Sequence, residues 1–300
     1  MAITAPHPAP GRQQLPAPPS RRPRARRMLS GVPRVLVTGL ILLFIVYPMI
    51  WMLLGSFKTQ DEFLGEPFWS LPDSFDPVNY VEAFTTGGMG HYIANSALAV
   101  LPSLALTLLL GVAAGFALEV MVWKGRSPIL LAFLAGIMVP GQMILLPLFT
   151  IYFKLHLTGT LWPLIITYTA TGLPLTVFMM ATYFRAIPRE IFEASTLDGA
   201  SILRSFWSVG VPMVRNALFT VGLVQFFFTW NDLLIALTFT NSNELQTVQV
   251  GLLNFTGQYG AVQYGPTFAA ICVNVFGTLA IYLVMNQRIM QGLTAGAVKG

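Results

Sequence analysis

The chain has 300 residues, of which 55% are hydrophobic and only 10% are charged. Because soluble domains carry about 25% charged residues, this composition excludes a soluble globular protein and predicts an all-α integral membrane protein. The single cysteine, Cys272, excludes a disulfide framework and a multi-cysteine metal site. The three histidines (His7, His91 and His156) lie far apart in the sequence, so no metal site is expected.

Residues 1–30 are rich in Pro, Ala, Gln and Arg, and such a tail cannot bury enough apolar surface to fold. The following run, residues 35–57, contains no charge and is long enough to cross the hydrocarbon core as a helix. A signal peptide has a shorter apolar core followed by a small-residue cleavage site. The sequence therefore predicts a disordered basic tail and an uncleaved first transmembrane helix at residues 31–58.

Five further stretches meet the same criterion: residues 92–118, 128–153, 155–184, 216–237 and 267–287. Residues 155–184 leave room for a short turn around Thr158–Gly159–Thr160 before the span begins. The sequence thus predicts six transmembrane helices, an extracytoplasmic loop at 59–90, a core transmembrane domain at 91–290 and a C-terminal tail at 291–300. Prolines within the spans are interpreted as kinks that a helix bundle tolerates: Pro48, Pro102, Pro140, Pro147 and Pro174.

The positions of lysine and arginine predict the orientation, because cytoplasmic loops carry an excess of these residues. With the N-terminal tail inside, only Lys58 and Lys154 lie outside, which leaves 15 of the 17 Lys and Arg residues (17 minus 2) on the cytoplasmic side. The loop at 59–90 instead carries Asp61, Glu62, Glu66, Asp73, Asp76 and Glu82. Both termini are predicted to be cytoplasmic. The excess of positive charge is then explained by topology, and no nucleic-acid partner is expected.

Residues 188–212 form a polar, helix-forming stretch between two predicted spans, on the cytoplasmic side. Pro188 suits the first turn of a helix, and Glu190 lies near the positive end of its dipole. Gly199 can adopt the left-handed conformation that ends a helix, and a second short helix is expected at about residues 201–209. Such a helix–turn–helix is too short to pack alone, so it requires a partner or the membrane surface. Composition alone does not separate these two interpretations.

The spacing of residues within this stretch favours a protein partner. Glu193-Ala194-Ser195, Gly199 and the run Val209-Gly-Val-Pro212 resemble the EAA loop (E-A-A-x3-G-x9-I-x-L-P) of permease subunits of binding-protein-dependent ABC importers. Ser replaces the second Ala, and Val replaces Ile and Leu. Trp230-Asn231-Asp232 and the tail from Gln291 resemble the carbohydrate-importer branch, and in particular its maltose-transporter-type shorter permease. The similarity covers roughly residues 30 to 300.

The resemblance implies a type I ABC importer permease fold in the plasma membrane of a prokaryote. It implies a second permease, a cytoplasmic ABC ATPase dimer that binds ATP and Mg, and an extracytoplasmic solute-binding protein that delivers a sugar. Glu193 would contribute charge to the ATPase socket, Gly199 would permit the bend, and Ala194 and Ser195 would allow close approach. The docking loop implied in this way comprises Glu193, Ala194, Ser195, Asp198, Gly199, Ala200 and Pro212.

The chain itself carries no catalytic motif. It has no G-x-x-x-x-G-K-[ST] phosphate loop, no H-E-x-x-H and no G-x-S-x-G. We therefore expect a non-enzymatic subunit without a cofactor of its own. A permease for another small polar solute, such as glycerol phosphate or a polyol, remains an alternative. A self-sufficient secondary transporter is disfavoured because several ionisable residues would be expected in mid-span.

Asp232 is the one acid inside a predicted span, and such acids are candidates for functional sites. It lies 17 residues after Arg215, about 25 Å along a helix, and so towards the outer end. Gln225, Thr229 and Asp232 recur at helical spacing and share a face with Gly222. These residues and Asn231 are predicted to line the pathway or to bond the partner permease; the alternative is an acid at the outer interface. Asn95 and Asn274 are expected to form helix–helix hydrogen bonds, and Glu119 is interpreted as a solvated charge.

Overall fold

The computed structural model describes residues 32–67, 69–255 and 262–297, and every regular element within these residues is a helix. The predicted tail at residues 1–30 lies outside them. The chain divides into two units, residues 1–50 and residues 51–300. In the first unit, the described residues form the apolar N-terminal part of α2 (Val32–Gly55). The described residues from Trp51 onward belong to the second unit.

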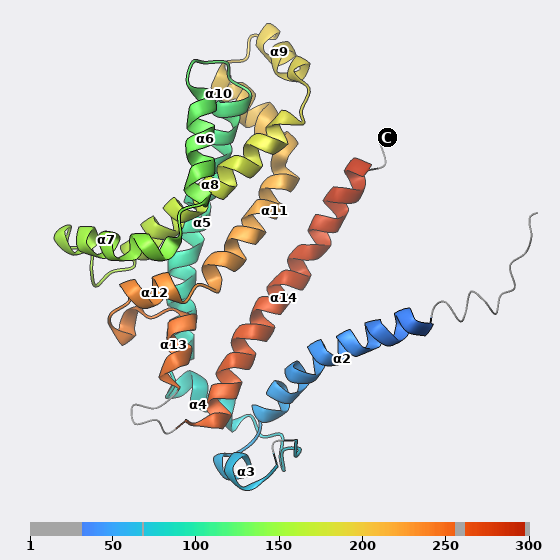
Figure 1. The fold of residues 1–300 in the computed structure, drawn as a ribbon, viewed down its shortest axis with the longest axis vertical. Helices are drawn as coiled ribbons and strands as arrows, with labels where there is room; N and C mark the ends of the chain where they lie inside the picture. Colours follow the sequence, from blue (N-terminus) through green and yellow to red (C-terminus); the bar gives the residue numbers. More distant parts are fainter. Residues whose placement is uncertain (1–31, 68, 256–261, 298–300) are drawn as a thin grey trace, which may run out of the picture. The chain divides into compact units, whose positions relative to one another are not determined.

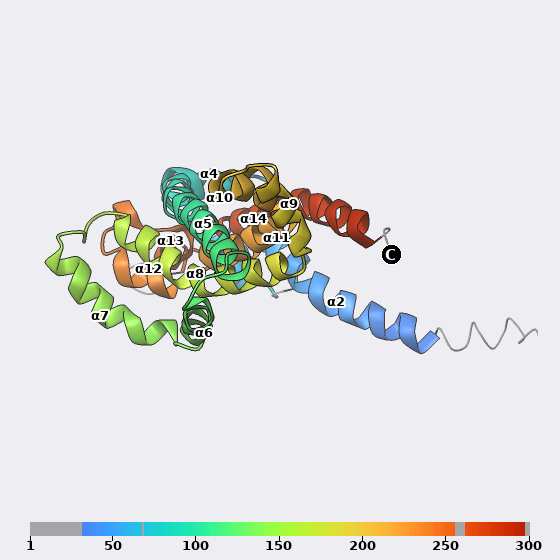
Figure 2. The same ribbon diagram turned by 90° about the horizontal axis from the view of Figure 1, so that it is seen from above.

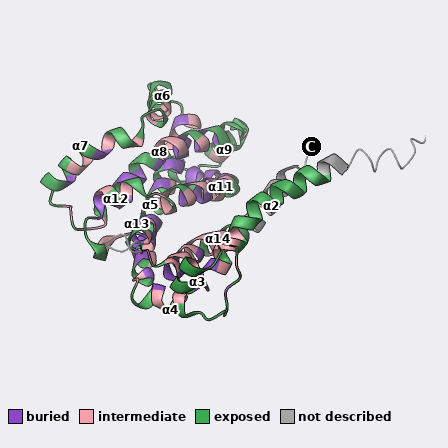
Figure 3. Cartoon of the chain, turned by 60° about the horizontal axis from the view of Figure 1, so that its bottom comes forward, coloured by how far each residue is buried: buried purple, intermediate pink, exposed green. Residues whose placement is uncertain are grey.

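Four long helices organise the second unit: α5 (Met89–Glu119), α8 (Trp162–Arg185), α11 (Val211–Trp230) and α14 (Tyr264–Ala297). The first three lie side by side in both ribbon views (Figures 1 and 2). Their facing sides carry much of the buried surface (Figure 3). Residues of the predicted tail up to Ala297 continue the last helix, α14.

The contact between α5 and α8 is the most extensive of the described helix pairs, and two glycines permit it. A Cβ on Gly111 would lie 2.3 Å from the Cγ2 of Thr176, and one on Gly115 would lie 2.6 Å from the Cβ of Met180. Small residues one helical turn apart let two backbones approach closely. The small-residue spacing in the sequence therefore marks a real packing face, and the two helices are held in a fixed register.

Five of the predicted spans are confirmed as helices long and apolar enough to cross a membrane: Val35–Gly55, Met89–Glu119, Trp162–Arg185, Ile202–Trp230 and Tyr264–Met285. A straight helix over residues 128–153 is not observed. That stretch forms α6 (Arg126–Ile137) and α7 (Gly141–Lys154), which are bent by 98° at the break. Pro140 stands before the first residue of α7 with an extended ψ of 122°, so the helix cannot continue through it.

Shorter helices occupy the ends of the long ones. Along the sequence, α3 (Gln60–Gly65) and α4 (Val78–Thr85) follow α2 and precede α5, and α9 (Arg189–Leu197) follows α8. α12 (Leu234–Phe239), the 3-10 turn η2 (Asn243–Leu245) and α13 (Val248–Asn254) connect α11 to α14. The predicted span at 216–237 therefore ends earlier than expected, at Trp230, and Asp232 follows the helix.

The predicted second helix of the polar stretch is not a separate element. α10 (Ile202–Ser205) continues through the π turn η1 (Phe206–Gly210) directly into α11. The backbone N–H of Val211 bonds to the carbonyl of Phe206, five residues back, which is the π pattern. Pro212 has no N–H to donate, so a local change of pitch accommodates it in the first turn of the span. Pro212 therefore lies in the first turn of α11 and does not close a loop.

Candidate functional site

The predicted turn of the 188–212 stretch is present. α9 ends with Asp198 as its C-cap, and Gly199 has a φ of +80°. The N–H of Gly199 bonds to the carbonyl of Thr196 at 3.0 Å, and the N–H of Ala200 bonds to that of Ser195 at 3.1 Å. These two bonds are the Schellman arrangement, which favours glycine at the left-handed position. Gly199 thus has the conformation that its place in the sequence predicts.

The chain then folds back on α9 through hydroxyl groups. Ser201 caps α10 by accepting the N–H of Arg204 at 3.3 Å. The hydroxyls of Ser195 and Ser205 are 2.5 Å apart and join α9 to α10 across the turn. Ser195 stands where the EAA pattern has alanine, so this hydrogen bond depends on a departure of this chain from that pattern.

An aromatic cluster that no sequence pattern predicted anchors α9 to its own chain. Phe192 is 8% exposed and packs edge-on against Phe116 of α5, with ring centroids 5.7 Å apart. Phe116 also contacts Phe184 of α8 and Phe206 of η1. The sequence predicted that this stretch needs a partner or the membrane surface to pack on, and the burial of Phe192 shows that part of that surface is the ends of α5 and α8 in the same chain.

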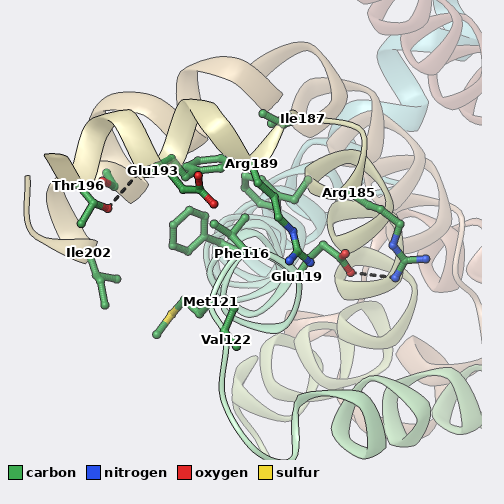
Figure 4. Close-up of a pocket in the computed structure, with 14 residues that line it drawn as sticks. Phe116, Glu119, Met121, Val122, Arg185, Ile187, Arg189, Glu193, Thr196 and Ile202 are labelled. Carbon is green, nitrogen blue, oxygen red and sulfur yellow. Dashed lines mark hydrogen bonds and ion pairs between the residues drawn. The ribbon is translucent and has the colours of Figure 1, made fainter. Parts of the chain in front are cut away.

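A pocket of about 400 Å³, the α9 pocket, lies between α9 and the C-terminal ends of α5 and α8. Glu193 and Arg189 border it on the α9 side, and Glu119 and Arg185 face them across it (Figure 4). Phe116, Met121 and Phe192 contribute apolar surface. Glu193, one of the predicted docking residues, therefore lines a cleft that contains both acidic and basic side chains.

The sequence suggested that Glu119 is a solvated charge, but the structure shows it in an ion pair. Its Oε2 lies 2.8 Å from Nη2 of Arg185, and its side chain is only 15% exposed. Arg126 donates to the carbonyl of Met121 at 3.1 Å and so satisfies one of the free carbonyls after α5. The ion pair fixes the C-terminal ends of α5 and α8 next to each other. It joins residues 66 positions apart, so no local pattern could have predicted it.

The outer face of the α9–α10 segment remains without a partner among the described residues. Ala194 and Gly199 are exposed, as is Glu193 at the edge of the α9 pocket. Leu197 is 88% exposed and Leu203 is 71% exposed. Exposed leucines beside small and acidic residues form a surface suited to a protein partner.

A second cleft, the α8–α11 pocket, brings together three of the predicted pathway residues. It has a volume of about 210 Å³ and is lined by Gln225, Thr229 and Asp232, together with Tyr168, Thr171 and Phe228. Gly222 does not share it, because that glycine faces Leu108 of α5. The pocket lies along the last turns of α11, at the end of that helix opposite to α9 (Figure 1).

The polar groups of this pocket are held by contacts within the chain. Gln225 is 5% exposed, and its Nε2 donates to the carbonyl of Gly172 and to the hydroxyl of Thr176, both at 3.0 Å. Oδ2 of Asp232 accepts the phenol of Tyr168 at 2.9 Å and the N–H of Ala236 at 3.0 Å. Asp232 thus stabilises the first turn of α12 and binds α8 at the same time.

The other candidates have more local roles. Asn231 donates to the carbonyl of Phe227 and accepts from Gln249, and it does not line the pocket. Asn274 accepts the indole N–H of Trp230 at 3.2 Å, which confirms a helix–helix bond between α14 and α11. Asn95 bonds to the carbonyls of Glu244 and Gln246 instead, so it holds the segment after α12 and not another long helix. Among the described residues, no group of His, Cys, Asp and Glu is arranged to hold a metal ion.

The fold is that of an ABC importer permease. It matches the crystal structure of a bacterial ABC transporter involved in the import of the acidic polysaccharide alginate, with a TM-score of 0.76. The match covers 89% of this chain and 98% of that chain, at 21% sequence identity. At this identity the likeness concerns the fold alone.

Sequence comparison gives the family. Residues 98–288 match the family described as "Binding-protein-dependent transport system inner membrane component". The chain belongs to this family. It is 34% identical to the diacetylchitobiose uptake system permease protein NgcG of Streptomyces coelicolor, over 85% of this chain and 84% of that protein. It is 31% identical to the trehalose/maltose transport system permease protein MalG of Thermococcus litoralis, over 89% and 96%. The predicted resemblance to carbohydrate ABC permeases is thereby confirmed.

Proposed function

We propose that this protein is one of two permease subunits of an ATP-driven importer for a sugar or oligosaccharide. The observation that carries the proposal is the family match over residues 98–288. Relatives with 31% and 34% identity are permeases for trehalose or maltose and for diacetylchitobiose. A solute-binding protein outside the cell would deliver the sugar, and a separate ATPase dimer would bind ATP and Mg and supply the energy.

In this proposal, the α9–α10 segment is the surface that the ATPase binds. Its geometry supports that role in two ways: Phe192 fixes α9 to the ends of α5 and α8, while Leu197 and Ala194 are left exposed. A load on α9 is therefore transmitted to two long helices through a packed aromatic contact. Glu193 supplies charge at the edge of the α9 pocket, where a basic group of the ATPase would be attracted.

The topology of the proposed subunit has six spans and cytoplasmic termini. The lysine and arginine distribution supports it. So does the parallel arrangement of α5 and α8, which pack closely along their length and whose C-terminal residues Glu119 and Arg185 form an ion pair. α9 then faces the cytoplasm, and the α8–α11 pocket lies towards the outside.

Co-purification of the ATPase with the detergent-solubilised permeases tests the docking role. Glu193→Lys reverses the charge of the docking surface, and Gly199→Val strains a residue with φ +80°. We expect both variants to reduce recovered ATPase about tenfold, because one lost charge pair or a misplaced helix costs roughly 1.4 kcal/mol or more.

Matched variants separate docking from general damage. Gly159→Val places the same residue at a left-handed glycine, φ +82°, in the turn between α7 and α8. Glu244→Lys makes the same charge reversal beyond α12. Both controls are expected to retain the ATPase. Full ATPase recovery with Glu193→Lys and Gly199→Val would show that α9 is not the docking surface.

A further inference from the structure

We infer that the α8–α11 pocket binds one uncharged sugar ring of the cargo and that Asp232 makes it select against anionic sugars. The inference rests on the proposed function and adds that this subunit itself contacts the cargo. It is carried by the hydrogen-bonding character of the lining, by the size of the pocket and by the sign of its charge.

The polar lining offers acceptors and almost no donors. The hydroxyls of Thr171 and Thr229 donate to main-chain carbonyls of their own helices, at 2.8 Å and 2.5 Å. The phenol of Tyr168 donates to Asp232, and both hydrogens of the Gln225 amide have partners. Each of these hydroxyl oxygens keeps a lone pair. A ligand that fits must therefore bring its own donors.

Two acceptors in particular have no partner among the described residues. Both bonds to Asp232 go to Oδ2, which leaves Oδ1 free. Oε1 of Gln225 accepts no hydrogen bond from these residues and is not among their fully buried, unpartnered oxygens. Gln225 nevertheless is 95% buried, so its free oxygen is aimed into the pocket by a fixed side chain. Such an acceptor gains from a donor that the ligand supplies.

Sugar hydroxyls supply what this lining lacks. A pyranose carries several O–H donors around its ring, and a carboxylate accepts them through charge-assisted hydrogen bonds. Phosphate, sulfonate and ionised carboxylate groups bring acceptors only, so they cannot satisfy Oδ1 of Asp232 or Oε1 of Gln225. A neutral polyhydroxylated ring therefore offers this lining more donors than an anionic solute such as glycerol phosphate, which carries fewer hydroxyls beside its acceptor-only phosphate.

Size and apolar surface limit the ligand to one ring. Ligand pockets usually measure about 300–1,000 Å³, and this one is smaller, at about 210 Å³. Phe228 is 64% exposed and, with Leu175 and Ile235, gives the pocket an apolar wall on which the C–H face of a sugar can pack. The rest of an oligosaccharide would lie outside this pocket.

The charge of the lining provides the selectivity. Asp232 is the only acidic residue that lines the pocket, and no Lys, Arg or His lines it to compensate that carboxylate. An anionic sugar would place a like charge within a few ångströms of this carboxylate, in surroundings of reduced dielectric constant. That repulsion is expected to lower the affinity of the pocket for an anionic sugar several-fold to about hundred-fold relative to a neutral sugar.

Cysteine labelling in the complete importer, reconstituted into liposomes, tests the pocket directly. Thr229→Cys in a Cys272→Ala background is treated with aminoethyl or sulfonatoethyl methanethiosulfonate, which are similar in size and opposite in charge. The rate of each reagent with Thr229→Cys is divided by its rate with free glutathione. After this normalisation, the cationic reagent is expected to react about tenfold faster than the anionic one because of Asp232. Adding Asp232→Asn should abolish this preference, and adding Glu244→Gln should leave it unchanged.

Protection by sugars tests the ligand class in the same preparation. Methyl glucoside is expected to slow the labelling of Thr229→Cys, and glucuronate at the same concentration and ionic strength is not. No labelling by either reagent, no charge preference, or equal protection by the two sugars would overturn the inference. None of these outcomes depends on ATPase docking, so the docking role proposed for α9 is tested separately, by ATPase recovery with the α9 variants.

Discussion

Glu62 of α3 shows how a single carboxylate can organise a segment outside the membrane spans. It is 8% exposed and accepts three hydrogen bonds: from the N–H and hydroxyl of Thr59, at 2.5 and 2.7 Å, and from the N–H of Asp73 at 2.7 Å. Thr59 and Glu62 form the capping box that starts α3. The sequence placed Glu62 among six acids of an external loop, and only the fold distinguishes it from the others.

Replacing Glu62 by Gln is expected to loosen the segment between α2 and α4. The amide keeps one acceptor oxygen but turns an NH₂ group towards backbone donors, which costs about 1–2 kcal/mol locally. Hydrogen exchange of peptides covering residues 59–76 should accelerate about tenfold in Glu62→Gln. Glu66→Gln is the control, because among the residues that the structure describes the side chain of exposed Glu66 accepts only from the hydroxyl of Ser70. Equal protection in the two variants would contradict the role given to Glu62.

The same segment should respond to pH. Hydrogen bonds, first the one from the N–H of Asp73, hold the pKa of Glu62 below its ordinary value of 4.5. A carboxyl whose pKa is lowered by folding stabilises the fold fully above its unfolded pKa, and the stabilisation is lost as the pH falls through the folded pKa. Protection of residues 59–76 should therefore be constant above about pH 5 and decline below 4.5 in the wild type. Glu62→Gln should show no such decline.

At the scale of the elements, the packing of α5 on α8 depends more on a close approach than on charge. The atoms nearest to a Cβ on Gly115 are the Cβ of Met180 and the backbone of residues 180 and 181, none of which can rotate away. Gly115→Ala should therefore destabilise the importer by about 1–3 kcal/mol, the usual cost of overpacking. The half-exposed ion pair at the end of the same helices is worth less, about 0–1 kcal/mol.

Thermal unfolding of the purified importer distinguishes these two contributions. Gly115→Ala should lower the midpoint clearly, whereas Glu119→Gln should shift it little. Gly277→Ala is the matched control, since a Cβ at Gly277 of α14 meets nothing within 4 Å. A larger loss from Glu119→Gln than from Gly115→Ala would reverse the proposed order of the two interactions.

Elements could be predicted from the sequence where one local rule decides them. Uncharged runs predicted the five confirmed spans, and most of their predicted ends lie within a few residues of the observed helix ends. Gly199 correctly marked the end of α9. Pro140 predicted a kink in this run but not the 98° bend that separates α6 from α7, because an apolar run carries no periodicity that distinguishes one helix from two. The burial of Phe192 and the position of Phe206 depend on packing against Phe116, which is remote in the sequence. The α8–α11 pocket likewise needs Tyr168 and Gln225, which only the fold brings together.

At the scale of the whole molecule, helix directions determine how the bent pair α6–α7 must lie. The ion pair between Glu119 and Arg185 joins the C-terminal residues of α5 and α8, so these helices run parallel. If both cross the membrane, the chain between them must return from one side to the other. A re-entrant α6–α7 pair would bring Trp162 back to the side of Glu119 and contradict that arrangement. The 98° bend is therefore compatible with one net crossing and with six spans in total.

Accessibility of two lysine positions tests this crossing, because Lys124 precedes α6 and Lys154 ends α7. Each is replaced by Cys in the Cys272→Ala background and labelled in right-side-out vesicles with a membrane-impermeant maleimide. Lys154→Cys should react in intact vesicles, whereas Lys124→Cys should react only after permeabilisation, as should Arg189→Cys of α9. One net crossing requires opposite sides for these two positions, since an even number would return the chain to the side it left. Labelling of both from the same side would make α6–α7 a re-entrant loop and the six-span topology wrong.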